Sequence, residues 1–354
     1  MSAEKSAAAR GHGGPDHLGV PLHDFSSNSN ACGPCPFALA AVQQADASRY
    51  PDASYTALRQ QLAGFHGVDA QRLVLAASAS EFIFRITALA AQRGAGAVWL
   101  PPHSYGDYAQ SAQSWKLPVV AQPAQAQLRW ACDPSSPLGV AHQGLAELLV
   151  TAALCVLDRA YEPLRLSGAL ALPDEALQKF WQLWTPNKAL GLTGVRAAYV
   201  IAPPGANDAV MQLESLAPSW PVGAHGAAML RAWCEPAVQQ WLAESLVTLR
   251  EWKERQKQVC ESIGWTVLPS NANFFVCHAG IEELVPDPDP GTSLSVHRDG
   301  LRIKPAMTDL RERGIKLRDC TSFGLPGHLR LSVQTPAAQD ALHHAWQNIS
   351  KASS

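Results

Sequence analysis

The sequence contains no apolar run long enough to cross a bilayer and no basic stripe of the kind that binds nucleic acid. Its first ten residues are small and polar, and they lack the apolar centre of a secretory signal. We therefore expect no membrane span, no nucleic-acid partner and a location in the cytoplasm. A formal net charge of −2 and a hydrophobic fraction of 47% also argue against a disordered chain.

The sequence also gives little support for disulfides or metal sites. Eight cysteines in a long chain without a secretory signal indicate reduced, mostly buried thiols. The tetrapeptide Cys32-Gly33-Pro34-Cys35 has the spacing of a thioredoxin-type redox pair, which stays open as an alternative. That chemistry needs the first cysteine at a helix N-terminus after a strand, whereas this tetrapeptide lies in an Asn- and Ser-rich arm. No second ligand pair follows at zinc spacing, so we expect no metal.

An alternation of strand-like and helical segments is present instead, without any internal repeat. The β-like runs lie at 72–76, 98–101, 118–121, 128–132, 153–158, 180–184 and 195–201, and helical patterns such as 80–92 and 139–151 lie between them. This alternation predicts a mainly parallel sheet with helices on both faces. Two long helical stretches, 224–243 and 245–263, follow. Strands at 273–277, 315–318 and 329–333 and helices near 307–313 and 336–350 then predict a smaller α+β part. Residues 287–292 should form a turn or insertion.

Lys188 is the most informative single residue. It follows an apolar strand-like run, with Thr185 three residues before it and Arg196 eight residues after it. An amine held in an apolar pocket at a strand exit is made nucleophilic by desolvation. A hydroxyl and a guanidinium nearby would bind a phosphate. A reactive amine beside a phosphate site is what pyridoxal phosphate requires. The alternative interpretation is a solvated loop lysine.

Further candidates lie at the ends of other predicted strands, where open α/β sheets bind ligands. Asp158 ends an apolar strand and would pair with a cationic pyridinium nitrogen, and Tyr161 would bond the ring oxygen. Ala79 and Ser80 lie between a strand and a helix, where backbone N–H groups bind phosphate. Tyr105 follows another strand and could stack on a planar ring. The alternatives are a helix-capping aspartate with a packing tyrosine, a plain serine cap and a core aromatic.

Together these residues resemble the fold-type-I pyridoxal-phosphate enzymes of the class I/II aminotransferases, especially the subgroup of histidinol-phosphate aminotransferases and threonine-phosphate decarboxylases. The resemblance runs from about His12 to the last helix. In that family the pattern S/T-x-x-K followed by G-x-R carries the lysine of the internal aldimine and a phosphate-binding arginine. The family also has a D-x-A-Y motif. These motifs fall here on Thr185, Lys188, Gly194 and Arg196, and on Asp158, Ala160 and Tyr161.

Other segments extend the resemblance. Residues 49–55 are similar to R-Y-P-D-x-x-Y, whose final tyrosine, here Tyr55, is implied to reach the cofactor phosphate of a neighbouring subunit. Arg330 matches the arginine that binds the substrate carboxylate or its phosphate-bearing counterpart. Arg318 begins a segment similar to V-R-D-C-x-S-F-G. Substrate contacts are also implied for Asn30 and for His12, whose G-H-G-G context is similar to the arm of the decarboxylases. A histidine in a disordered tail is the alternative for His12.

One departure from the family pattern concerns the cofactor's ring oxygen. The family usually has N-P-N-N-P-T-G, in which the asparagine before the second proline bonds that oxygen. Residues 133–139 read D-P-S-S-P-L-G, so Ser136 takes its place. A serine is shorter and leaves the ring oxygen mainly to Tyr161. The phosphate loop, residues 77–80, is also poorer in glycine than is usual.

The resemblance implies an α/β fold, the pyridoxal-phosphate transferase fold type I, with a mainly parallel seven-stranded sheet. It further implies an N-terminal arm (1–45) joining the small domain, a large cofactor-binding domain (46–263) and a small domain (264–354). We expect a homodimer with shared active sites, because a phosphate ligand donated by Tyr55 requires a partner subunit.

The activity implied is transfer of an amino group from an amino acid or phosphorylated amino compound, with a 2-oxo acid as the possible second substrate. Loss of the α-carboxylate instead would give an L-threonine-O-3-phosphate decarboxylase of cobalamin biosynthesis. Because Ser136 departs from the pattern, a catalytically weak module that binds the cofactor and regulates is a third alternative.

Overall fold

The computed structural model describes residues 13–149, 153–279 and 303–353. His12 and the turn expected at 287–292 lie outside these residues. Within them, no helix is long and apolar enough to cross a membrane.

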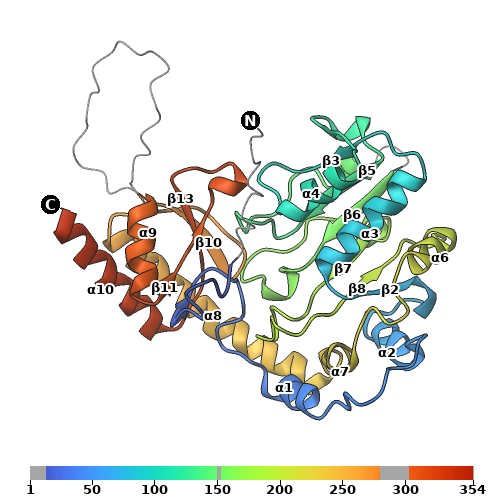
Figure 1. Ribbon diagram of the computed structural model, residues 1–354, viewed down its shortest axis with the longest axis horizontal. Coiled ribbons are helices and arrows are strands. Elements are labelled where there is room, and N and C mark those ends of the chain that lie inside the picture. The colour runs from blue at the N-terminus through green and yellow to red at the C-terminus, as the bar shows by residue number, and fades with distance from the viewer. Residues whose placement is uncertain (1–12, 150–152, 280–302, 354) are drawn as a thin grey trace, which may run out of the picture.

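A seven-stranded sheet forms the larger half of the molecule, in the order β2-β8-β7-β6-β5-β3-β4 (Figure 1). Its strands are β2 (Leu73–Ala76), β3 (Val98–Trp99), β4 (Val119–Val120), β5 (Leu128–Cys132), β6 (Leu154–Asp158), β7 (Trp181–Trp184) and β8 (Ala198–Ile201). Strands β4, β3, β5, β6 and β7 are parallel, and β8 runs antiparallel to both β2 and β7. The predicted α/β fold with a mainly parallel seven-stranded sheet is confirmed.

Helices cover both faces of this sheet because its inner strands are apolar on both sides. In β2, Leu73 and Leu75 belong to one buried cluster and Val74 and Ala76 to another, as the two-residue period of a strand requires. The second cluster packs against α3 (Ala79–Gln92), α4 (Gly106–Ser114) and α6 (Asn207–Ser215). The first packs against α1 (Pro36–Gln43), α2 (Thr56–His66), α7 (Ala224–Trp233) and α8 (Pro236–Ser262).

A four-stranded antiparallel sheet, in the order β12-β13-β10-β9, forms the smaller half. Its elements are β9 (Thr266–Val267), β10 (Phe274–His278), β12 (Arg318–Asp319) and β13 (His328–Ser332), with helices α9 (Ile303–Glu312) and α10 (Pro336–Ser353). The N-terminal segment joins this half, since β1 (His23–Asp24) pairs in parallel with β11 (Ile315–Lys316). Helix α8 runs along both halves (Figure 1). The exact domain boundaries stay a prediction.

Two helical predictions were wrong in their extent. The predicted break near residue 244 is absent: α8 begins at Pro236, which suits a first helical turn because it has no N–H to leave unpaired, and continues to Ser262. The helix predicted at 139–151 reduces, in the described residues, to a short 3-10 turn, Ala146–Leu149. Gly139 and Gly144 both adopt a positive φ of 73°, which interrupts a right-handed helix.

The remaining described elements are one short helix and four 3-10 turns. They are α5 (Asp174–Leu177), η1 (Ala70–Arg72), η2 (Pro123–Gln125), η4 (Glu162–Leu164) and η5 (Thr321–Phe323).

Candidate active site

Lys188 lies in the segment that leaves β7, at the edge where the parallel strands end. Its Nζ lies 5.3 Å from the ring centroid of Tyr161. Its carbonyl oxygen accepts a hydrogen bond of 2.9 Å from the backbone N–H of Asn30, in the N-terminal arm. The end of β7 and the arm therefore both hold the backbone of this lysine.

Asp158 ends β6 next to Lys188 and is only 5% exposed. The hydroxyl of Tyr108 donates to its Oδ2 at 2.6 Å, and the N–H of Ala160 donates to its Oδ1 at 2.9 Å. Burial raises the pKa of Asp158, and the hydrogen bond from Tyr108 opposes that rise. Asp158 forms no ion pair with a described residue, and a cationic ring nitrogen would supply a counter-ion in direct contact.

Tyr108 was not among the predicted site residues. Its ring stacks on Trp130 of β5 with centroids 4.3 Å apart and an interplanar angle of 14°. Burial and the neighbouring Asp158 raise the pKa of this phenol. Tyr108 therefore stays protonated and can donate its hydrogen bond to Asp158. Its position three residues after Tyr105, on the same face of the first turn of α4, was the signal that would have found it.

Tyr161 and Tyr105 belong to different elements and both line the candidate site. The hydroxyl oxygen of Tyr161 accepts a hydrogen bond from Nδ2 of Asn28 at 3.3 Å, and its ring meets Phe274 edge-on with centroids 4.7 Å apart. Tyr105, directly before α4, has its hydroxyl 3.4 Å from Oγ of Ser80. The two tyrosines thus stand beside Lys188 and the start of α3, respectively.

The groups predicted to bind phosphate lie along one edge of the sheet, where Ala76 of β2 and Trp184 of β7 pair with the first residues of β8. Ala79 and Ser80 are its first residues, so their N–H groups have no partner within the helix. The hydroxyl of Thr185 is buried and has no hydrogen-bond partner among the described residues. Arg196 is exposed and forms no ion pair with any described residue. An orphaned buried hydroxyl, a helix N-terminus and an uncommitted guanidinium fit a phosphate.

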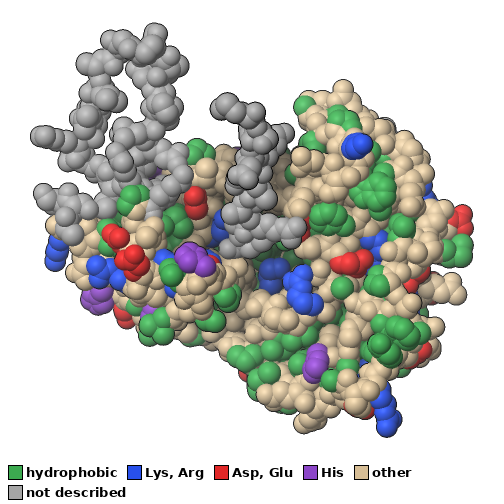
Figure 2. Space-filling view, viewed as in Figure 1, with side chains coloured by type: hydrophobic (Ala, Val, Ile, Leu, Met, Phe, Trp, Pro, Cys, Tyr) green, Lys and Arg blue, Asp and Glu red, His purple; other side chains and the backbone are tan. Residues whose placement is uncertain are grey.

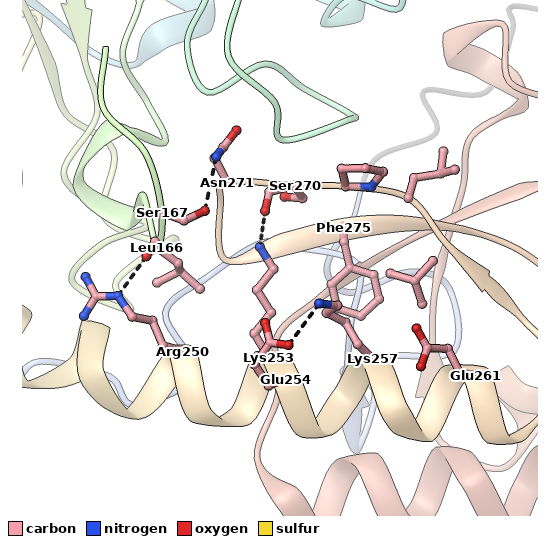
Figure 3. Close-up of a pocket in the computed structure, with 13 residues that line it drawn as sticks. Leu166, Ser167, Arg250, Lys253, Glu254, Lys257, Glu261, Ser270, Asn271 and Phe275 are labelled. Carbon is pink, nitrogen blue, oxygen red and sulfur yellow. Dashed lines mark hydrogen bonds and ion pairs between the residues drawn. The ribbon is translucent and has the colours of Figure 1, made fainter. Parts of the chain in front are cut away.

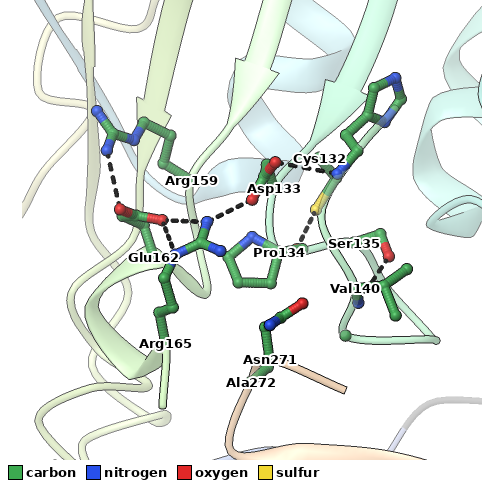
Figure 4. Close-up of polar contacts among 12 residues, drawn as sticks. Cys132, Asp133, Pro134, Ser135, Val140, Arg159, Glu162, Arg165, Asn271 and Ala272 are labelled. Carbon is green, nitrogen blue, oxygen red and sulfur yellow. Dashed lines mark hydrogen bonds and ion pairs between the residues drawn. The ribbon is translucent and has the colours of Figure 1, made fainter. Parts of the chain in front are cut away.

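Ser136 lies in a loop, residues 133–140, that a buried ion pair holds in place (Figure 4). Asp133 is 1% exposed and pairs with Arg165, whose guanidinium also contacts Glu162 at 2.6 Å. The second oxygen of Asp133 accepts from the N–H of His142 at 3.0 Å. The charged residue at 133, where the family pattern has asparagine, is therefore matched by a cation and is not left unpaired.

Two arginines face the site from the smaller sheet. Arg318 and Arg330 are opposite each other in the register of β12 and β13. Arg330 donates to the carbonyl of Ser26 at 2.8 Å and to Oγ of Ser136 at 3.4 Å, and its Nε is buried without a partner. Arg318 donates to Oγ of Ser322 at 2.8 Å. Neither forms an ion pair with a described residue. Burial and then the charge of Arg330 lower the pKa of Arg318.

The other predicted residues are placed less directly. The side chain of Asn30 is 3% exposed and donates to the carbonyl of Ala189, so it touches the lysine segment. The hydroxyl of Tyr55 donates to the carbonyl of Val222 at 2.7 Å and accepts from its N–H at 3.1 Å. Tyr55 would have to leave both partners to reach a phosphate in another subunit. His12 lies outside the described residues.

The cysteines match the expectation of free thiols. All eight cysteines lie in described parts of the chain and none forms a disulfide. Cys35 precedes α1, and burial raises the pKa of Cys32 to about 11, which is unlike a reactive thiolate. Among the described residues no group of three or more His, Cys, Asp or Glu side chains could hold a metal.

The space-filling view shows a hollow between the two halves, with cationic side chains inside it (Figure 2). A separate cavity of about 810 Å³ lies between α8 and residues 267–271 (Figure 3). At its edge the ammonium of Lys253 donates to the carbonyls of Ser270 and Ala272 at 2.6 and 2.8 Å. Lys253 thereby ties α8 to the connection between β9 and β10.

Comparison with known proteins shows the family to which this chain belongs. A family model described as aminotransferase class I and II matches residues 20–136 and 130–345. The chain belongs to this family. The family match, the aminotransferases among the relatives and the fold together identify the protein as a pyridoxal-phosphate-dependent aminotransferase.

Several relatives and solved structures resemble this aminotransferase. The histidinol-phosphate aminotransferase of Halorubrum lacusprofundi is 27% identical, covering 89% of this chain and 85% of that protein. The crystal structure of histidinol-phosphate aminotransferase from Sinorhizobium meliloti in complex with pyridoxal-5'-phosphate has a TM-score of 0.75 at 20% identity, covering 94% and 92% of the two chains. L-threonine-O-3-phosphate decarboxylase from Porphyromonas gingivalis has a TM-score of 0.72 at 19% identity, covering 92% and 99%. At these identities the solved structures show a shared fold.

The residues around Lys188 fit the cofactor. When bound, pyridoxal phosphate supplies an electron-withdrawing ring that weakens the bonds at the substrate's α-carbon. Asp158, held by Tyr108, would keep the ring nitrogen protonated, and Tyr161 would donate to the ring oxygen. The start of α3, Thr185 and Arg196 would hold the phosphate. Lys188 would attach the cofactor and then move a proton at the α-carbon. These individual roles stay predictions.

Proposed function

We propose that this aminotransferase acts on an amino compound that carries a phosphate or a comparable anionic group, as a histidinol-phosphate aminotransferase does. The observation that carries the proposal is the pair Arg318 and Arg330. Two guanidinium groups at opposite positions of β12 and β13, neither in an ion pair with a carboxylate among the described residues, leave about two positive charges for a substrate. Relatives named histidinol-phosphate aminotransferase support the same substrate class.

The aromatic surroundings of the arginines also support this assignment. The guanidinium of Arg318 lies 5.0 Å from the ring centroid of Phe323, and that of Arg330 lies 5.6 Å from Phe274. Flat guanidinium groups held against rings are oriented for bidentate contact with phosphate or carboxylate oxygens. His103, in the loop before Tyr105, contacts the carbonyl of Phe323 at 2.7 Å and so links the cofactor side to the arginine side.

A homodimer with shared active sites is part of the proposal, and we place the enzyme in the cytoplasm. Eight free thiols support a reducing compartment. In the segment that implied the shared site, Tyr50 is 76% exposed and stacks on Trp220 with centroids 4.3 Å apart, whereas Tyr55 is 4% exposed. We therefore assign the contact with the partner's cofactor to Tyr50 in place of Tyr55.

An assay with two substrates tests the proposal. Protein loaded with pyridoxal phosphate is given histidinol phosphate plus 2-oxoglutarate, and separately O-phosphothreonine without an oxo acid. We expect amino transfer in the first assay and no release of carbon dioxide in the second. Arg330→Gln should raise KM for histidinol phosphate at least tenfold, because a charge-assisted bidentate contact is worth about 1.5–3 kcal/mol. Arg313→Gln, at an exposed arginine of the same half, is the matched control.

The alternatives give distinct results in the same assay. Carbon dioxide released from O-phosphothreonine, with no amino transfer, would identify a decarboxylase. Inactivity in both assays, in protein that holds the cofactor, would indicate a regulatory module. Either result would contradict the proposed activity.

A further inference from the structure

Asn28 is a buried polar residue that the active-site prediction did not include. It lies in the arm between β1 and α1, its side chain is fully buried, and its backbone is left-handed with φ of 57°. Its Nδ2 donates to the hydroxyl oxygen of Tyr161 at 3.3 Å, and its Oδ1 has no partner among the described residues. Asparagine is among the few residues that tolerate this backbone conformation, so the position is built for such a side chain.

The direction of this hydrogen bond matters for the cofactor. Because Asn28 donates, the oxygen of Tyr161 acts as acceptor, and the phenolic proton of Tyr161 stays available for another acceptor. The ring oxygen of pyridoxal phosphate is the acceptor assigned to Tyr161. Asn28 therefore selects the donor orientation of that hydroxyl.

Ser136 does not orient the hydroxyl of Tyr161. Its Oγ lies 3.4 Å from the guanidinium of Arg330, so the residue at the usual asparagine position is engaged with the substrate arginine. No contact between Ser136 and Tyr161 occurs among the hydrogen bonds of the described residues. The side-chain amide that contacts the hydroxyl of Tyr161 is that of Asn28, in the arm.

Two further contacts hold Asn28 in place. Nδ2 of Asn273 donates to the carbonyls of Asn28 and Ser29 at 3.2 and 3.3 Å. Asn273 directly follows Ala272, whose carbonyl, like that of Ser270, accepts a hydrogen bond from the ammonium of Lys253. The contact with Ser270 is drawn in Figure 3. Helix α8, the connection between β9 and β10 and the arm thus form one chain of contacts that ends at Tyr161.

We propose that Asn28 is a positioning residue that orients the hydroxyl of Tyr161 toward the cofactor's ring oxygen and compensates for the serine at position 136. The proposal rests on pyridoxal phosphate binding at Lys188 and is independent of the substrate. In this proposal the N-terminal arm helps to set the hydrogen bonding of the cofactor's ring oxygen. Asn28 then supplies the side-chain amide that the 133–139 motif lacks at Ser136.

The test follows the visible absorbance of bound pyridoxal phosphate as the pH is varied. A hydrogen bond to the ring oxygen stabilises its anionic form, so losing that bond raises the pH midpoint of the absorbance change. Asn28→Gly, which suits the left-handed backbone, should raise the midpoint by about one pH unit. Asn28→Asp keeps the shape but accepts the phenolic proton, and should raise it at least as far.

Two second-site variants separate positioning from a general structural effect. In a Tyr161→Phe background, Asn28→Gly should add no further shift, because Asn28 acts only through Tyr161. Ser136→Asn should return the Asn28→Gly midpoint most of the way toward that of the unchanged protein.

An unchanged midpoint in both Asn28 variants, or an equal shift in the Tyr161→Phe background, would overturn this inference while leaving the proposed function intact. If the unchanged protein takes up no pyridoxal phosphate, the proposed function fails and this inference fails with it. Should Asn28→Gly not fold, the Asn28→Asp result decides alone.

Discussion

The burial and the hydrogen-bond donors of Asp158 determine how this carboxylate would hold a ring nitrogen. A carboxylate at this depth is costly unless its charge is satisfied, and burial accordingly raises its pKa. Only the hydroxyl of Tyr108 and the N–H of Ala160 donate to it among the described residues. The phenol of Tyr108 thus contributes directly to keeping the acid ionised.

Tyr108→Phe should therefore weaken cofactor binding in a pH-dependent way. Without the phenolic donor the pKa of Asp158 rises further, and the neutral acid does not pair with a cationic ring nitrogen. We expect the Kd for pyridoxal phosphate at pH 7 to rise about tenfold, the equivalent of about 1.4 kcal/mol. Fluorescence titration at several pH values measures it.

Recovery at high pH distinguishes this effect from damage to the fold. As the pH rises, Asp158 ionises again and the affinity of the variant should approach that of the unchanged protein. A tenfold loss that is constant from pH 6 to pH 9 would contradict the role given to Tyr108.

Among the elements of the site, the arm and the lysine segment touch backbone to backbone. Gly191, with φ of 68°, lies where an added Cβ would be 2.9 Å from Cα of Gly33. The N–H of Cys35 also donates to the carbonyl of Leu190 at 2.8 Å. Glycine at both positions lets the two backbones touch, and this touch holds the arm against the segment of Lys188.

Gly191→Ala should consequently lower the free energy of unfolding by more than backbone strain alone would. Gly67 is a matched control, because its φ is 63° and an added Cβ would meet nothing within 4 Å. Left-handed strain costs about 1–2 kcal/mol at either position. We expect urea denaturation to show a loss of unfolding free energy at least 1 kcal/mol greater for Gly191→Ala than for Gly67→Ala. Equal losses would mean that the arm does not depend on this close approach.

Strand ends were predictable from the sequence, whereas contacts between distant segments were not. Strands β5, β6 and β7 are apolar runs buried on both faces, so their ends, and with them Asp158 and the segment of Lys188, could be located from local pattern. The partners of those residues come from far along the chain: Asn28 meets Tyr161 across 133 positions. Such pairings leave no periodic signal, and the ion pair of Asp133 with Arg165 escaped prediction for the same reason.

At the scale of the whole molecule, stability in acid should depend on His66 at the end of α2. Burial, and then the charge of Arg159, lower the pKa of His66 from 6.5 to about 4. Between these values the unfolded chain binds a proton that the folded chain does not. The free energy of unfolding therefore falls as the pH drops from 6.5 toward 4, by up to about 1.4 kcal/mol per pH unit from this group.

His66→Gln removes that proton and should flatten the dependence over this range, as measured by thermal unfolding at intervals of half a pH unit. His17→Gln, at an exposed histidine, serves as control and should keep the original slope. The same slope in both variants would show that other groups dominate acid unfolding.

The attachment of the cofactor to Lys188 is tested most directly by borohydride reduction of protein loaded with pyridoxal phosphate, followed by peptide mass analysis. We expect a cofactor tag on the peptide that contains Lys188 and no tag in Lys188→Ala. A tag on another lysine, such as Lys253, or no tag on protein exposed to the cofactor, would contradict this expectation.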